Sequence, residues 1–190
     1  MHGHLPAMKM QVGFRTSVAA VAILTALGTT ATSSVTGRAS ERPQGGDASR
    51  GKPPTVLFLC PHGAAKSVLA SAYFQRAAKE RGLNVRVDSA GTEPDEQVSS
   101  AVSSHLTKNG YAIPIAKPRK VTSADLAAAD VIISIGCDPK TLPGQPPSNA
   151  LRRWDEVPAP SEDFARADDA IKKRVMDLVE ELVRKQQTSR

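Results

Sequence analysis

The stretch Thr55–Ser67 reads TVLFLCPHGAAKS and decides the fold. Its first part, Thr55–Leu59, is a continuous apolar run, which is typical of a strand covered on both faces. Cys60 ends this predicted strand and a loop of small residues follows. Ala64–Arg81 then has the apolar spacing of a helix that stops at Gly82. A buried strand, a short loop and a helix in this order predict the first unit of a parallel α/β sheet.

The same alternation of strands and helices continues along the chain. Thr122 and Asp125 have the spacing of a capping box at the start of a helix. Strands separated by helices require right-handed crossovers, which give a parallel sheet with helices on both faces. We therefore expect a three-layer α/β/α domain over residues 54–187, with a four-stranded sheet in the order 2-1-3-4. Further strands are expected at Asn84–Ser89, Asp130–Gly136 and Leu151–Trp154, and further helices at Gln97–Asn109 and Glu162–Lys185.

The net charge of +6 is divided unevenly along the 190 residues. Residues 1–52 carry six Lys and Arg against two acids, whereas residues 53–190 carry nineteen against seventeen, a difference of only +2. Lys and Arg residues also occur in short clusters, but no aromatic residue lies among them on which a nucleic-acid base could stack. These features exclude a nucleic-acid-binding protein.

The N-terminal segment has the plan of a secretory signal. The first forty residues contain no acid, and Lys9 and Arg15 precede the uncharged run Ser17–Gly28. This run is shorter than the ~20 residues that span a bilayer. We therefore expect a cleaved leader at residues 1–39, a flexible linker at 40–53, export to the periplasm or the exterior, and no membrane span after cleavage. Cleavage after Ala31 and cleavage after Ala39 both fit the small-residue rule. A misassigned start would instead leave the protein in the cytoplasm.

The loop after Cys60 has the composition of an anion-binding site. The N–H groups at a helix start have no partner inside the helix, and the helix dipole adds positive potential there. A cysteine at the base of such a loop is held near donors that favour thiolate over thiol. Lys66 can add positive charge, and Ser67 can donate a hydrogen bond to the sulfur. The predicted oxyanion-binding residues are Pro61, His62, Gly63, Ala64, Ala65, Lys66 and Ser67. The alternative interpretation is a buried, inert Cys60 before an ordinary turn.

The chain has a second cysteine, Cys137, after the third predicted strand. In a sheet of order 2-1-3-4, ligands bind beyond the carboxyl ends of the strands, so both sulfurs are expected to open onto one crevice. In an exported chain the two thiols are a candidate disulfide pair. A small apolar role for Cys137 at the strand end is the alternative. Neither cysteine lies in a zinc-binding spacing, so we expect no metal.

The pattern Cys60-x5-Lys66-Ser67 resembles the Cys-x5-Arg-Ser/Thr anion loop of the low-molecular-weight protein tyrosine phosphatases and of the arsenate reductases built on the same fold. The stretches that resemble the arsenate reductase branch, especially the type coupled to thioredoxin or mycothiol, are DSAGTEP at 88–94, AKPRKVT at 116–122, ADVIISIGCDP at 129–139 and RRWDEVPAP at 152–160.

This resemblance implies that Cys60 attacks arsenate and that a second thiol resolves the adduct and releases arsenite. Cys137 would be that second thiol, or an external donor such as thioredoxin or mycothiol would supply it. No bound cofactor is implied. The expected partners are a small oxyanion, arsenate or phosphate, or a phosphotyrosine, together with a thiol-reducing partner.

Two residues depart from the family pattern. Lys66 stands where the family has Arg, and an ammonium lacks the planar fork that grips two oxygens of an oxyanion. The Asp of the late Asp-Pro pair is replaced in Ala159-Pro160, so Asp155, four residues upstream, is the nearest candidate for the general acid. We therefore expect a reductase-like activity. The alternatives are a weakened or inactive phosphatase and a non-catalytic oxyanion-binding protein.

Three further features have two interpretations each. His62 either faces solvent or tunes the Cys60 thiolate. Glu93, Asp95 and Glu96 belong either to an exposed acidic turn or to the rim of the crevice. Trp154 either packs beneath the last loop or forms a wall of the crevice.

Overall fold

The computed structural model describes residues 52–188. The leader predicted at residues 1–39 and most of the linker lie outside the described residues. Among the described residues, no helix has both the length and the apolar character needed to cross a bilayer.

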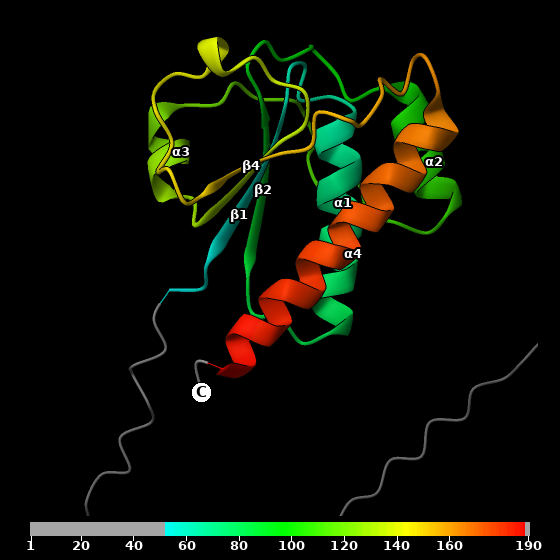
Figure 1. Ribbon diagram of the computed structural model, residues 1–190. Coiled ribbons are helices and arrows are strands. Elements are labelled where there is room, and N and C mark those ends of the chain that lie inside the picture. The colour runs from blue at the N-terminus through cyan, green and yellow to red at the C-terminus, as the bar shows by residue number, and fades with distance from the viewer. Residues whose placement is uncertain (1–51, 189–190) are drawn as a thin grey trace, which may run out of the picture. The chain divides into compact units, whose positions relative to one another are not determined.

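The described residues form the predicted parallel sheet, with the strand order β2-β1-β3-β4 (Figure 1). The strands are β1 (Thr55–Cys60), β2 (Arg86–Gly91), β3 (Val131–Ser134) and β4 (Leu151–Arg153). The helices are α1 (Lys66–Glu80), α2 (Ser100–Lys108), α3 (Ser123–Ala128) and α4 (Phe164–Thr188), with a single 3-10 turn, η1, at Pro139–Thr141. The predicted topology and all four predicted strands are confirmed.

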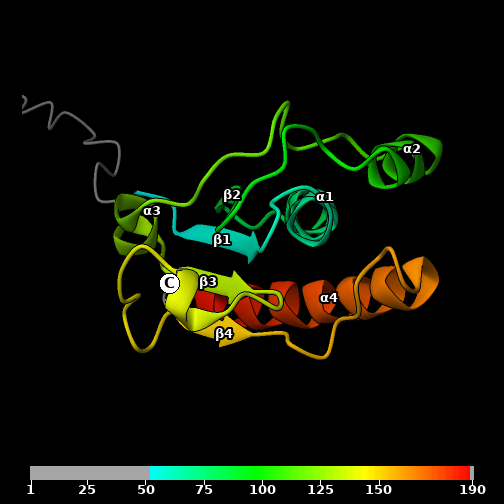
Figure 2. The same ribbon diagram turned by 90° about the horizontal axis from the view of Figure 1, so that it is seen from above.

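Helices cover both faces of the sheet, as Figure 2 shows, with α1 and α4 on one side of the strands and α3 on the other. The alternation of side chains along β1 explains this arrangement. Phe58 packs into the larger core under α1 and α4, whereas Leu57 and Leu59 pack into a smaller core with Leu126 of α3. Both faces of β1 are therefore buried, which is why its sequence is continuously apolar.

The ends of the helices follow the sequence signals. Gly82 and Gly110 adopt positive φ angles of 62° and 69° just after α1 and α2, as glycines that end helices do. Thr122 and Asp125 form the predicted capping box at the start of α3, each accepting a hydrogen bond from the backbone N–H of the other. This part of the prediction is confirmed.

A buried carboxylate joins α1, α2 and α4. Asp168 of α4 is 5% exposed and accepts a hydrogen bond from the Tyr73 hydroxyl of α1. Its carboxylate also lies 2.6 Å from Lys172 Nζ and 3.3 Å from His105 Nε2 of α2. A buried carboxylate needs such partners, because an unpaired charge is strongly destabilising in the interior. The cluster fixes α2 against α1 and α4.

Candidate active site

The loop that joins β1 to α1 is packed tightly against the end of β2. Gly63 has a φ angle of 60°, and a Cβ atom there would lie 2.8 Å from the backbone nitrogen of Gly91. A Cβ atom at Gly91 would in turn lie 2.6 Å from the nitrogen of Gly63. Both positions therefore require glycine.

Three carbonyl groups of this loop point away from its centre, because each accepts a hydrogen bond from the segment that follows β2. With their carbonyls held outward, the peptide units present their N–H groups to the inside of the loop. The three bonds are Glu93 N to Pro61 O at 2.8 Å, Asp95 N to His62 O at 3.0 Å and Ser99 N to Ala64 O at 3.0 Å.

The inward N–H groups are available to a ligand. Within residues 52–188, those of residues 62–66 donate no hydrogen bond. The first turn of α1 contains no acidic residue, and Ala65 at its N-cap provides no side-chain hydrogen bond. A helix start without capping carries unpaired N–H donors and positive potential, which is the arrangement that binds oxyanions.

Cys60 lies at the base of this loop. Its Sγ atom donates a hydrogen bond to Ser67 Oγ at 3.2 Å and accepts one from the Ser67 backbone N–H at 3.5 Å. Both residues are buried, at 2% and 0% exposure. The thiolate form of a cysteine is the nucleophile, and both the backbone N–H and the hydroxyl of Ser67 are placed to donate to it. The predicted contact between Ser67 and the sulfur is present, although here the hydroxyl accepts from the thiol and donation by Ser67 Oγ stays a prediction for the thiolate.

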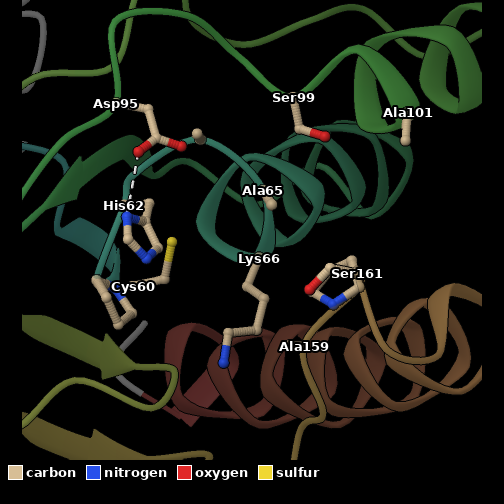
Figure 3. Close-up of a pocket in the computed structure, with 12 residues that line it drawn as sticks. Cys60, His62, Ala65, Lys66, Asp95, Ser99, Ala101, Ala159 and Ser161 are labelled. Carbon is tan, nitrogen blue, oxygen red and sulfur yellow. Dashed lines mark ion pairs between the residues drawn. The ribbon is translucent and has the colours of Figure 1, made fainter.

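A cavity of about 480 Å³ opens above the cysteine (Figure 3). Figure 3 shows Cys60, His62 and Asp95 on one side of it and Ala159 and Ser161 on the other. Of the predicted oxyanion-binding residues, Gly63 and Ser67 do not line the cavity, because Gly63 packs on Gly91 and Ser67 lies under the sulfur. The lining residues are Cys60, Pro61, His62, Ala64, Ala65, Lys66, Asp95, Ser99, Ala101, Ala159, Pro160 and Ser161.

His62 and Asp95 form an ion pair at the wall of this cavity. His62 Nδ1 lies 3.1 Å from Asp95 Oδ1, and the two side chains are 65% and 53% exposed. His62 is thus largely solvent-facing, as one interpretation holds, and still lines the cavity. For Asp95 the rim position is the correct interpretation, whereas Glu93 and Glu96 are exposed and do not line the cavity.

The sequence model of the family described as low molecular weight phosphotyrosine protein phosphatase matches residues 55–142. A Halobacterium salinarum protein named provisionally as an arsenate reductase is 26% identical over 129 residues, which are 65% of this chain and 89% of that protein. The crystal structure of an Archaeoglobus fulgidus arsenate reductase is similar at 31% identity and a TM-score of 0.53, over 66% of this chain and 98% of that chain. The chain belongs to the low-molecular-weight protein tyrosine phosphatase superfamily, in its arsenate reductase branch.

A third relative comes from the same superfamily. The thioredoxin-dependent arsenate reductase of Corynebacterium glutamicum is 26% identical, with a TM-score of 0.61. The similarity covers 74% of this chain and 65% of that chain.

Lys66 occupies the position of the superfamily arginine and lines the cavity. Its Nζ atom lies 3.5 Å from the carbonyl oxygen of Val157, and a Cβ atom at Gly136 would lie 2.9 Å from it. The ammonium group thus adds positive charge beside the loop as a point charge, without the bidentate fork of a guanidinium.

Cys137 does not line the cavity, contrary to the expectation that both sulfurs open onto one crevice. Cys60 packs into the core under α1 and α4, whereas Cys137 packs into the core on the α3 face. Gly136, with a φ of 74°, turns the chain between β3 and this cysteine. Both cysteines are free thiols in the structure, and burial raises the pKa of Cys137 to about 11. A resolving role for Cys137 stays a prediction.

Asp155 also lies outside the cavity lining. Its carboxylate accepts a hydrogen bond from Arg153 Nε at 2.7 Å and is exposed to solvent. Ala159 and Pro160, which align with the family's Asp-Pro pair, do line the cavity. Asp155 could act as the general acid only if this loop adopted another conformation.

Trp154 is 5% exposed and packs against Phe58 at a ring-centroid distance of 6.0 Å, so the packing interpretation is correct.

The sequence does not reveal three residues of the cavity wall, which are Ser99, Ala101 and Ser161. They belong to the start of α2 and to the segment before α4, which meet only in the folded chain. The only signal in the sequence that could have placed them at the cavity is their small size. Small residues are common in any loop, so this signal does not identify a site.

Proposed function

We propose that this protein is an arsenate reductase that uses Cys60 as its nucleophile. The observation that carries the proposal is the cysteine at the base of a loop whose N–H groups of residues 62–66 donate to no other described residue, with Ser67 directed at the sulfur. A tetrahedral oxyanion seated on these N–H groups has its central atom next to Sγ. The similarity to arsenate reductases supports the same assignment.

The chemistry has two steps. In the first, the Cys60 thiolate attacks arsenic(V), so that an S–As bond forms while an As–O bond breaks and its oxygen leaves as water after protonation. In the second, an added thiolate attacks the Cys60 sulfur. The S–As bond then breaks with its electron pair on arsenic, which leaves as arsenite, and Cys60 remains in a disulfide. A further thiol reduces that disulfide and returns Cys60.

Reduction is favoured over phosphate-ester hydrolysis by the wall opposite Cys60. Ester hydrolysis at neutral pH needs a positioned acid for the leaving oxygen, and such an acid contributes ~10²–10⁴-fold to the rate. The segment before α4 presents Ala159 and Pro160 to the cavity in place of a carboxylic acid. Asp155 lies outside the cavity lining. Phosphatase activity that depends on an acid at this position is therefore the weaker candidate.

The second thiol is proposed to come from outside the chain. Cys137 is 2% exposed, does not line the cavity and carries a raised pKa, so it is a poor source of thiolate at neutral pH. The cavity of about 480 Å³ leaves Cys60 open to a thiol of the thioredoxin or mycothiol type. If residues 1–39 are a cleaved leader, the donor must be one that operates outside the cytosol. Mass spectrometry of the mature protein would define its N-terminus and the state of both cysteines.

Arsenite release from arsenate in the presence of a dithiol tests the proposal. Cys60→Ser should abolish release, whereas Cys137→Ser should retain it. Turnover of p-nitrophenyl phosphate without arsenite above the Cys60→Ser background would instead establish a phosphatase. Phosphate or arsenate binding by calorimetry, without either activity, would establish an oxyanion-binding protein.

A further inference from the structure

The cavity lacks a carboxylic acid where this superfamily has one, yet expulsion of an oxygen from arsenic requires a proton. The segment before α4 contributes Ala159, Pro160 and Ser161 to the cavity, and none of these residues is an acid. Any side-chain proton donor must therefore lie on the other walls. The titratable side chains there are His62, Lys66 and Asp95, besides Cys60 itself.

Of these groups, His62 is the one built to hold and release a proton. Imidazole changes its charge near neutral pH, which suits a general acid. His62 belongs to the anion loop, lies two residues after the nucleophile and lines the same cavity as Cys60. Lys66 is directed instead at the Val157 carbonyl, 3.5 Å away, and serves as fixed charge.

Asp95 fixes the orientation of the imidazole ring. Its Oδ1 atom lies 3.1 Å from His62 Nδ1, and its backbone N–H donates to the His62 carbonyl oxygen at 3.0 Å. The two residues are therefore tied through both backbone and side chain, as the dashed line in Figure 3 shows for the side chains. With Nδ1 held by the carboxylate, Nε2 is the ring nitrogen left free to act on a ligand.

Resting on the proposed function, we propose that His62 is the catalytic proton donor to the oxygen that leaves arsenic, and that Asp95 is its positioning residue. As the Sγ–As bond forms and the As–O bond breaks, the Nε2–H proton of His62 passes to the departing oxygen, which leaves as water. The imidazole is then neutral, and the Asp95 carboxylate keeps its charge throughout. Solvent at the open face reprotonates the ring.

The test compares the full chain with His62→Ala, Asp95→Asn and the control Glu96→Gln, which changes an exposed acid that does not line the cavity. Each protein is assayed for arsenite release with a dithiol, for arsenate affinity by calorimetry, and for its thermal midpoint. We expect His62→Ala to lower the rate ~10²-fold or more, with arsenate affinity changed less than about threefold, because general acid catalysis contributes ~10²–10⁴-fold. Asp95→Asn should lower the rate by a smaller factor, and Glu96→Gln should match the wild type.

Added imidazole separates a chemical role from a structural one. In His62→Ala, imidazole should restore the rate at least tenfold in a concentration-dependent manner, while it leaves Cys60→Ser inactive. An unchanged rate in His62→Ala, or a lowered rate with lost arsenate binding and no rescue, would overturn the role of His62. A wild-type protein that releases no more arsenite than Cys60→Ser would overturn the proposed function itself, and the inference with it.

Discussion

Gly63 and Gly91 meet backbone to backbone, and a Cβ atom on Gly91 would lie 2.6 Å from the nitrogen of Gly63. Gly91 is itself fixed, because its N–H donates to the Arg119 carbonyl oxygen and its own carbonyl oxygen accepts from Val121 N–H. The end of β2 is therefore a rigid support for the anion loop. This contact fixes the path of the loop against the end of β2.

Gly91→Ala is expected to disrupt this support. Neither backbone can move away without loss of hydrogen bonds, so the substitution should destabilise the protein by about 2–3 kcal/mol, the upper range for overpacking. Phosphate or arsenate affinity should fall at least tenfold. Urea unfolding and calorimetry measure the two effects. Gly144→Ala is the matched control, because its Cβ atom would meet only Ser123 Cβ at 3.8 Å, and it should change stability by less than ~0.5 kcal/mol.

Ser67→Ala is expected to reduce the reactivity of Cys60. A hydrogen bond to a charged group contributes about 1.5–3 kcal/mol, so loss of the Oγ donor should slow alkylation of Cys60 by iodoacetamide at pH 7 by about tenfold or more. Ser71→Ala is the control on the same helix, since Ser71 Oγ is buried and has no hydrogen-bond partner. It should leave alkylation unchanged and should not destabilise the protein. Equal alkylation rates in both variants would show that Ser67 does not stabilise the thiolate.

The fold was predictable because its signals are local. The continuous apolar run of β1 requires a strand covered on both faces, and the glycines after α1 and α2 mark where these helices end. The capping box of Thr122 and Asp125 lies within four residues of sequence. The main error was in β2, which was predicted at Asn84–Ser89 and extends to Gly91. The missing signal there is non-local, because Gly91 is required by its contact with Gly63.

The site was predictable only in its contiguous part. The residues 60–67 form one loop, so their order along the chain reports their arrangement in space. The position of Cys137 was not predictable in this way, because the turn at Gly136 places it in the core on the other face of the sheet. The pairing of His62 with Asp95 joins residues 33 positions apart and likewise requires the folded loop.

Lys66→Arg is expected to strengthen oxyanion binding. A guanidinium can donate two parallel hydrogen bonds to two oxygens, whereas the ammonium acts as a point charge. We expect phosphate affinity measured by calorimetry to rise about tenfold, or about 1.4 kcal/mol. Lys79→Arg, at the far end of α1, should have no effect. A loss of affinity in Lys66→Arg would show that the cavity is shaped for the shorter side chain.

Ala159→Asp is expected to convert the protein toward a phosphatase. Ala159 lines the cavity where the superfamily has its acid, so a carboxyl group there should protonate a leaving oxygen. Hydrolysis of phenyl phosphate, which has a poor leaving group, should rise ~10²-fold or more, and that of p-nitrophenyl phosphate should rise less. Ala101→Asp places the same charge on another wall of the cavity and should give no such gain. Equal gains with both esters would mean that the carboxyl group acts otherwise than as an acid.

Cys137 should make stability depend on pH in the alkaline range. Burial raises its pKa from 9.0 to about 11 in the folded protein, so between these values the folded chain keeps a proton that the unfolded chain has lost. The protonated thiol of Cys137 therefore makes its full contribution to the free energy of unfolding below pH 9. This contribution is lost as the pH rises through 11. Cys137→Ala removes this dependence. The difference in unfolding free energy between wild type and Cys137→Ala should therefore shift by about 1 kcal/mol per pH unit from pH 9 to 11, with wild type losing stability faster. Urea unfolding at pH 8, 9, 10 and 11 measures it, and parallel curves for the two proteins would show that Cys137 ionises as freely as an exposed thiol.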